Sequence, residues 1–228
     1  MKSLYESIMQ SRFPINKIEE SIMQSRFPIN KIEESILNKS GVGLEVKIDE
    51  WCKKYGIKDY TINNKGEIDS NIGINISHKD IKELPFFIRF GTVKEYFYCN
   101  SCGLTSLKGC PRVVEGDFSC SDNDLKSLEG APEKVEGDFS CSDNYLMSLE
   151  GAPEKVEGYF NCSHNFLEDL KGSPKEVGDY FNCCTNNLKS LEGAPKKVGA
   201  SFSCRENFVR FTETDVKKIC KVKQTIYV

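Results

Sequence analysis

The sequence lacks the features that mark exported, membrane-spanning and nucleic-acid-binding proteins. It has no run of about 18 apolar residues, and its first ten residues hold no unbroken apolar stretch of the kind found in secretory signals. Neither sign of charge dominates, because 31 basic residues stand against 34 acidic ones and the net charge is −3. This balance argues against a nucleic-acid footprint or a polybasic membrane surface. We therefore expect a soluble, cytoplasmic protein with neither kind of partner.

Residues that usually carry enzyme chemistry are also scarce. The only histidines are His78 and His164, and neither recurs in a constellation with a nucleophile and a carboxylate. No phosphate-binding loop or Rossmann glycine pattern is present. Cys99 and Cys102, with Cys110 nearby, resemble a metal site, but each fits a column of the repeat described next and too few ligands converge. The sequence predicts no catalytic residues, no metal and no cofactor.

What the sequence does contain is a period of 21 residues. Each unit carries the pattern F-x-C-x-x-N-x-L, and its alternation predicts a short strand whose Phe and Cys point inward. The phenylalanine column comprises Phe97, Phe118, Phe139, Phe160, Phe181 and Phe202, and the cysteine column comprises Cys99, Cys120, Cys141, Cys162, Cys183 and Cys204. Such columns are typical of a stack of similar turns around one continuous core.

The spacing within each unit resembles the leucine-rich-repeat consensus L-x-L-x-x-N/C-x-L. The resemblance implies a leucine-rich-repeat solenoid, a right-handed superhelix with short parallel strands on its concave face, preceded by an N-terminal helical segment. It also implies that an asparagine column bonds the backbone of successive turns, namely Asn123, Asn144, Asn165, Asn186 and Asn207. The second half of each unit carries Gly and Pro, which a helix interior does not accept. We therefore expect an irregular convex face of extended chain or short 3₁₀ turns.

Four segments are expected along the chain. Repeat stacks need atypical ends that cover their apolar surface, so we expect a cap on either side of the repeats. The segments are a helical N-terminal segment (1–43), a cap of helix plus hairpin (44–71), repeats of about 21 residues (72–211) and a cap of helix plus strand (212–228). Thr212 or Thr214 is the expected cap of the last helix.

The N-terminal segment contains one fourteen-residue block, SIMQSRFPINKIEE, written twice without change. Pro14 and Pro28 suit the first position of a helix, and two heptads leave an apolar stripe nearly in phase. The stripe comprises Ile15, Ile18, Ile22, Ile29, Ile32 and Ile36. Two interpretations stay open: a helix that docks onto a partner or a second copy, or a tail in which the block was duplicated without a role.

The candidate site is the outward side of the predicted strands, because no other surface competes with it. Tyrosine supplies rigid contact area with a polar tip, and Ser and Asn supply hydrogen-bonding groups. The candidate contact residues are Tyr96, Tyr98, Asp117, Ser119, Asp138, Ser140, Tyr159, Asn161, Tyr180, Asn182 and Arg205. We expect a non-enzymatic protein–protein interaction module. The alternative is a structural protein whose N-terminal helices oligomerise the solenoid.

The chain as a whole resembles uncharacterised leucine-rich-repeat proteins of tailed phages and of gut bacteria. The resemblance implies a host or virion protein as partner, bound through the concave face, the N-terminal helices or both, in the host cytoplasm if the protein is phage-encoded. It covers nearly the whole chain and is specific to fold rather than to function.

The eleven cysteines are expected to be free thiols. Column cysteines on neighbouring strands have parallel side chains, which is poor geometry for a disulfide, and buried cysteine packs as a small apolar residue. Cys184 belongs to an outward column and is expected to be exposed, whereas the sequence does not decide the state of Cys52 and Cys220.

Overall fold

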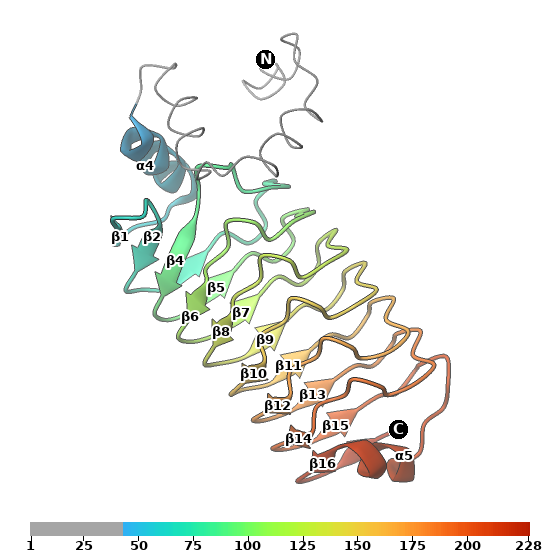
Figure 1. Ribbon diagram of the computed structural model, residues 1–228. Coiled ribbons are helices and arrows are strands. Elements are labelled where there is room, and N and C mark those ends of the chain that lie inside the picture. The colour runs from blue at the N-terminus through green and yellow to red at the C-terminus, as the bar shows by residue number, and fades with distance from the viewer. Residues whose placement is uncertain (1–42) are drawn as a thin grey trace, which may run out of the picture. The chain divides into compact units, whose positions relative to one another are not determined.

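A computed structural model describes residues 43–228 of the chain. The duplicated block and its six stripe isoleucines lie outside the described residues. Ile48–Val228 forms one compact unit, and within it the chain winds as a parallel β-solenoid of stacked turns of about 21 residues (Figure 1). The expectation of a repeat solenoid is thereby confirmed.

Each turn gives one short strand to each of two sheets that run along the stack (Figure 1). The eight-stranded Phe sheet consists of β3 (Ile74–Asn75), β5 (Phe97–Tyr98), β7 (Phe118–Ser119), β9 (Phe139–Ser140), β11 (Phe160–Asn161), β13 (Phe181–Asn182), β15 (Phe202–Ser203) and β17 (Ile226–Tyr227). Its strands pair in parallel, and Phe118 lies opposite both Phe97 and Phe139, so the sequence period is also the strand register.

The second half of each turn forms a second regular sheet. The nine-stranded Val sheet consists of β1 (Tyr60–Ile62), β2 (Ile68–Ser70), β4 (Phe90–Val93), β6 (Val113–Val114), β8 (Lys134–Val135), β10 (Lys155–Val156), β12 (Glu176–Val177), β14 (Lys197–Val198) and β16 (Lys221–Val222). This half is extended, which was one of the two expected conformations, but it pairs into a regular sheet where an irregular face was expected. Pro132 precedes β8, so its missing N–H takes nothing from the ladder, and Glu133 N donates to Arg112 O while Glu136 N donates to Val114 O.

The core is a continuous aromatic stack. All six column phenylalanines are at most 1% exposed, and neighbouring ring centroids lie 5.0 to 6.0 Å apart. At the N-terminal end Phe90 extends the stack, 5.1 Å from Phe97, and Trp51 packs on Phe90 at 6.2 Å. Trp51 belongs to α4 (Leu44–Tyr55). The buried face of this helix thus covers the first ring of the stack.

The asparagine column ties each turn to its neighbour. Asn144 Oδ1 accepts a hydrogen bond from Leu125 N, and its Nδ2 donates to Cys120 O and Cys141 O at 3.0 and 3.2 Å. In the first full repeat a cysteine takes this place, and Cys102 Sγ donates to Ile76 O at 3.0 Å. These contacts satisfy peptide groups that the turning backbone would otherwise leave buried and unpaired.

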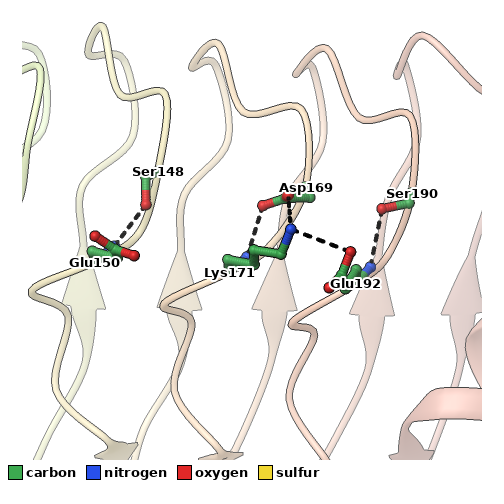
Figure 2. A network of polar contacts seen from close by, with 6 residues as sticks. All are labelled: Ser148, Glu150, Asp169, Lys171, Ser190 and Glu192. Atoms are coloured by element: carbon green, nitrogen blue, oxygen red, sulfur yellow. Dashed lines mark hydrogen bonds and ion pairs between the residues drawn. The ribbon is translucent and has the colours of Figure 1, made fainter.

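Short polar side chains shape the outer loops (Figure 2). Ser148 Oγ accepts a hydrogen bond from Glu150 N, and at the same position one turn later Asp169 Oδ1 accepts one from Lys171 N. Lys171 Nζ also lies 3.0 Å from Asp169 and 3.3 Å from Glu192 of the following turn. Burial alone raises the pKa of Asp169, but these contacts with Lys171 outweigh it, so the pKa is lowered. Because the charges are exposed, such pairs add little to stability.

Both ends of the stack carry additional elements. β1 and β2 form an antiparallel hairpin in which Tyr60 lies opposite Ser70. At the other end α5 (Glu213–Ile219) begins after Thr212, which forms a capping box with Asp215. β16 and β17 then add the last strands of the Val and Phe sheets.

All eleven cysteines are free thiols, as expected. Ten of them are buried, including Cys52 and Cys220, and Cys184 is half-buried rather than fully exposed. In residues 43–228 no group of three or more metal-ligating side chains has a suitable arrangement. None of the helices in this part of the chain is long and apolar enough to cross a membrane.

Candidate functional site

The eleven sequence-predicted contact residues lie on or beside the strands of the Phe sheet. Strand alternation turns the residue after each phenylalanine away from the core, and the strands align these residues in one row: Tyr98, Ser119, Ser140, Asn161, Asn182, Ser203 and Tyr227. We call this outward side of the Phe sheet, with the residues that flank it, the polar face. Its two halves use their polar groups differently.

The two aspartates of the polar face hold the backbone of the next turn. Asp117 Oδ1 accepts a hydrogen bond from Asp138 N at 2.9 Å, and Asp138 Oδ1 accepts one from Tyr159 N at 2.8 Å. A Cβ atom at Gly137 or Gly158 would lie 2.2 or 2.1 Å from these carboxylate oxygens and 2.7 or 2.8 Å from a backbone carbonyl carbon of the preceding turn. Because that backbone is paired and cannot give way, only glycine fits there. Burial raises the pKa of Asp138, and the charge of Asp117 adds to the rise. Both carboxylates therefore stabilise the stacking of successive turns.

The tyrosines at the N-terminal end of the polar face are held in place. The rings of Tyr96 and Tyr98 stack at 4.6 Å with an interplanar angle of 22°. The hydroxyl of Tyr98 donates to Asp117 Oδ2 at 3.2 Å. Burial raises the pKa of Tyr98, and the Asp117 carboxylate raises it further. The phenol is thus protonated throughout the physiological pH range.

The serines of the N-terminal half bond to one another. Ser121 and Ser140 share a hydrogen bond of 2.7 Å, and Ser142 donates to Ser121 at 3.1 Å. Ser119 donates to Asn100 Oδ1 at 2.6 Å. Ser140 is only 6% exposed. The serines of this half are therefore largely satisfied within the stack, whereas the NH₂ groups of Asn75 and Asn100 have no acceptor in the described part of the chain.

The C-terminal half leaves two hydrogen-bond donors unused. Asn161 Oδ1 accepts a bond from Ser163 N and Asn182 Oδ1 accepts one from Cys184 N, both at 3.1 Å. Neither side-chain NH₂ group has an acceptor among the described residues. Asn161 and Asn182 lie opposite each other on β11 and β13, two strands whose backbones are about 4.8 Å apart. Both side chains are half-buried and are fixed by the hydrogen bonds to their Oδ1 atoms. Their NH₂ groups are therefore held in place and remain able to donate to a partner.

A hollow of about 450 Å³ lies at the C-terminal end of the polar face. Its lining comprises Asp179, Tyr180, Ala200, Ser201, Ser203, Arg205, Gln224 and Tyr227. The guanidinium of Arg205 lies over the ring of Tyr227, 4.8 Å from its centroid, and burial raises the pKa of Tyr180.

Sequence reasoning missed Tyr227 and Gln224, because the last cap falls outside the 21-residue register. The alternation of an inward and an outward residue in Ile226–Tyr227 matches that of its strand partner, Phe202–Ser203. This alternation could have placed Tyr227 on the polar face. Cys184, at the edge of this region, places its Sγ 2.8 Å from Ser203 Oγ. This contact and the neighbouring strands explain why the thiol is only half exposed.

The C-terminal half of the polar face thus combines unused NH₂ donors on two neighbouring strands with two tyrosines and a hollow. Comparisons with protein-family models, with curated proteins and with solved structures found no match.

Proposed function

We propose that this protein is a non-enzymatic protein-binding module of the leucine-rich-repeat type, and that the C-terminal half of its polar face contacts the partner. The observation that carries the proposal is the pair of unused NH₂ groups on Asn161 and Asn182. The 21-residue period and the asparagine column support the leucine-rich-repeat assignment. If the protein is phage-encoded, the proposed partner is a host or virion protein that it meets in the host cytoplasm.

The chemistry of this half suits a segment of polypeptide. Two donors on neighbouring strands are placed to meet carbonyl oxygens of a partner backbone. Tyr159 and Tyr180 flank them in one column and supply apolar area with a polar tip, the combination that protein-recognition surfaces favour. The strands beneath are held by Phe160 and Phe181, both fully buried. A rigid surface of this kind loses little conformational entropy on binding.

The N-terminal half contributes less to binding in this proposal. Asp117, Asp138 and Ser140 already use their polar groups within the stack. Tyr96 and Tyr98 form a stacked pair in which the Tyr98 hydroxyl is already bonded to Asp117.

A second candidate function is self-assembly through the N-terminal segment. The observation that favours it is the exact duplication of a block whose length keeps an apolar stripe nearly in phase. In that case the solenoid displays a surface while the isoleucine stripes join copies of the chain. One protein can have both functions. A solution mass that rises with protein concentration would indicate self-assembly.

The test compares a donor variant with a control on the other sheet. Asn161→Asp with Asn182→Asp keeps the Oδ1 acceptors that the backbone uses and replaces each NH₂ group by an oxygen. The expected result is loss of the partner captured by the unchanged chain, with an unaltered melting temperature. Lys155→Ala, on the exposed Val sheet, is expected to capture the partner normally. Equal capture by both variants would contradict the proposal.

A further inference from the structure

Two neighbouring loops carry an apolar cluster outside the polar face. Tyr145, Met147 and Phe166 lie on the loops that follow β9 and β11, and they are 50%, 73% and 48% exposed. The rings of Tyr145 and Phe166 stack nearly parallel, with centroids 5.8 Å apart and an interplanar angle of 7°. Two stacked rings and a thioether, all open to solvent, form a concentrated apolar surface.

The repeat itself does not require apolar residues at these positions. In other turns the column of Tyr145 and Phe166 holds Gly103, Asp124, Asn187 and, in the last repeat, Phe208, and the column of Met147 holds Thr105, Lys126, Glu168 and Lys189. Those turns build the same strands in the same register. What is specific to these two adjacent turns is the stacked pair of rings, since the turn between Phe166 and Phe208 holds Asn187. The formation of the strands does not explain this pair.

The cluster borders an acidic hollow of about 360 Å³. Its lining includes the ionisable and aromatic residues Asp122, Asp124, Asp143, Tyr145, His164 and Phe166 together with Asn123, Asn144 and Gly103, and no Lys or Arg lines it. Within residues 43–228 none of the three aspartates forms an ion pair, whereas Glu168 nearby pairs with Lys189 at 2.7 Å. Asp122 accepts one hydrogen bond, from Ser101 Oγ at 2.7 Å. The hollow thus combines unpaired negative charge with aromatic surface.

We propose that this acidic aromatic patch binds a cationic segment of a partner protein in which Arg or Lys stands next to an aromatic or aliphatic residue. The apolar side chain of the segment packs on Tyr145 and Phe166. The neighbouring cation is attracted both by the carboxylates and by the faces of the rings. Nucleic acid and anionic membrane are disfavoured, because the hollow repels phosphate.

The patch is independent of the polar face. It lies on the loops after the strands, shares no side chain with the C-terminal half of the Phe sheet, and selects for a different charge. If the patch does not bind the cationic peptide, the proposed function of the polar face is unaffected. Failure of partner capture through the polar face likewise leaves the proposal for the patch unaffected.

The test uses the full chain and a labelled hexapeptide of alternating Arg and Phe, followed by fluorescence anisotropy at low salt. We expect saturable binding that weakens as salt rises. Peptides of alternating Glu and Phe, or Arg and Ser, are expected to bind at least about tenfold more weakly, since each lacks one of the two contributions.

Substitutions to residues that other turns hold at the same position test the site. Phe166→Asn and Met147→Lys introduce residues that neighbouring turns hold at Asn187 and Lys126, so both leave the fold unchanged. Each is expected to weaken binding about tenfold, as is Asp124→Asn with Asp143→Asn. Asn is the chosen replacement because Asp143 has φ 55°, a conformation that Asn tolerates.

Phe208→Ala is the matched control. Phe208 belongs to the same column and is 75% exposed, but it does not line the acidic hollow, so its removal is expected to leave affinity unchanged. The proposal is overturned if the Arg–Phe peptide fails to saturate, if the Glu–Phe peptide binds equally well, or if Phe208→Ala weakens binding as much as Phe166→Asn. Self-association that Phe166→Asn abolishes would assign the patch to a second copy and overturn it too.

Discussion

Asn144 holds Leu125 in place across one full turn of the solenoid: its Oδ1 accepts a hydrogen bond from the Leu125 backbone N–H at 3.0 Å. The same side chain donates to Cys120 O and Cys141 O. With a further bond from Nδ2 to Ser142 O at 3.1 Å, one amide therefore bonds to four backbone groups that belong to two consecutive turns. This relationship repeats along the asparagine column and sets the first prediction.

Asn144→Ala is expected to lower the free energy of unfolding by about 3–5 kcal/mol, because buried backbone groups lose their partners. Asn187→Ala is the control, since Asn187 is exposed and its replacement should stay within about 0.5 kcal/mol. Urea denaturation measures both. Similar losses of unfolding free energy for the two variants would show that the asparagine column does not provide this stabilisation.

Phe139→Ala is expected to cost about 3–5 kcal/mol through lost burial and a cavity in the aromatic stack. Ser140→Ala, one residue away on the outward side, is expected to cost about 1 kcal/mol. That residue is 6% exposed and bonded to Ser121, so a hydrogen bond is lost. Equilibrium unfolding of both variants gives the comparison, and a Ser140 cost equal to that of Phe139 would contradict the inward–outward assignment.

Thiol reactivity should follow burial. We expect all eleven cysteines to react after denaturation and Cys184 to react first under native conditions, because the other ten are buried. Mass spectrometry of a partially alkylated native sample identifies the labelled site. Disulfides in an unoxidised preparation, or early labelling of Cys141, would argue against this packing.

Stability should fall at alkaline pH. Burial raises the pKa of Cys52 and that of Cys220 to about 11, whereas an unfolded cysteine has a pKa of about 8.5. Above that value the unfolded state releases protons that the folded state retains, so unfolding becomes easier as pH rises. The stability is expected to be intact below about pH 8.5 and to decline progressively toward pH 11.

The measurement is the urea midpoint at several pH values between 7 and 10. Cys52→Ala with Cys220→Ala should start from lower stability but show a flatter decline, by up to about 1.4 kcal/mol per pH unit for each thiol removed. Parallel curves for the two proteins would mean that these thiols do not drive the effect.

The duplicated block gives a prediction about assembly. If its isoleucine stripe docks onto a partner or another copy, deleting one fourteen-residue copy should weaken association, and deleting both should abolish it. The melting temperature of the solenoid should not change, because the block lies outside the repeat register. Light-scattering mass of the three chains decides the matter. Unchanged mass together with undiminished partner recovery would rule out docking.

The sequence by itself determined the stacking of the turns. Phe118, Cys120 and Asn123 recur every 21 residues, and a period shared by inward-facing residues leaves one register in which every column can be buried. The inward direction of Phe and Cys follows from local alternation and could therefore be predicted from the residues alone. The bonding role of asparagine was predicted from the resemblance to leucine-rich repeats.

Only the tertiary structure decided how the turns use their remaining groups. Three examples depend on atoms about 20 residues apart in sequence. Lys155–Val156 pairs with Glu176–Val177, Asp138 accepts a hydrogen bond from Tyr159 N, and Ser140 is buried. Tyr145 and Phe166 likewise form a patch only because adjacent turns bring their rings together. Such contacts depend on distances between turns, which composition and periodicity do not specify, and they decide which side chains of a repeated pattern stay available to a partner.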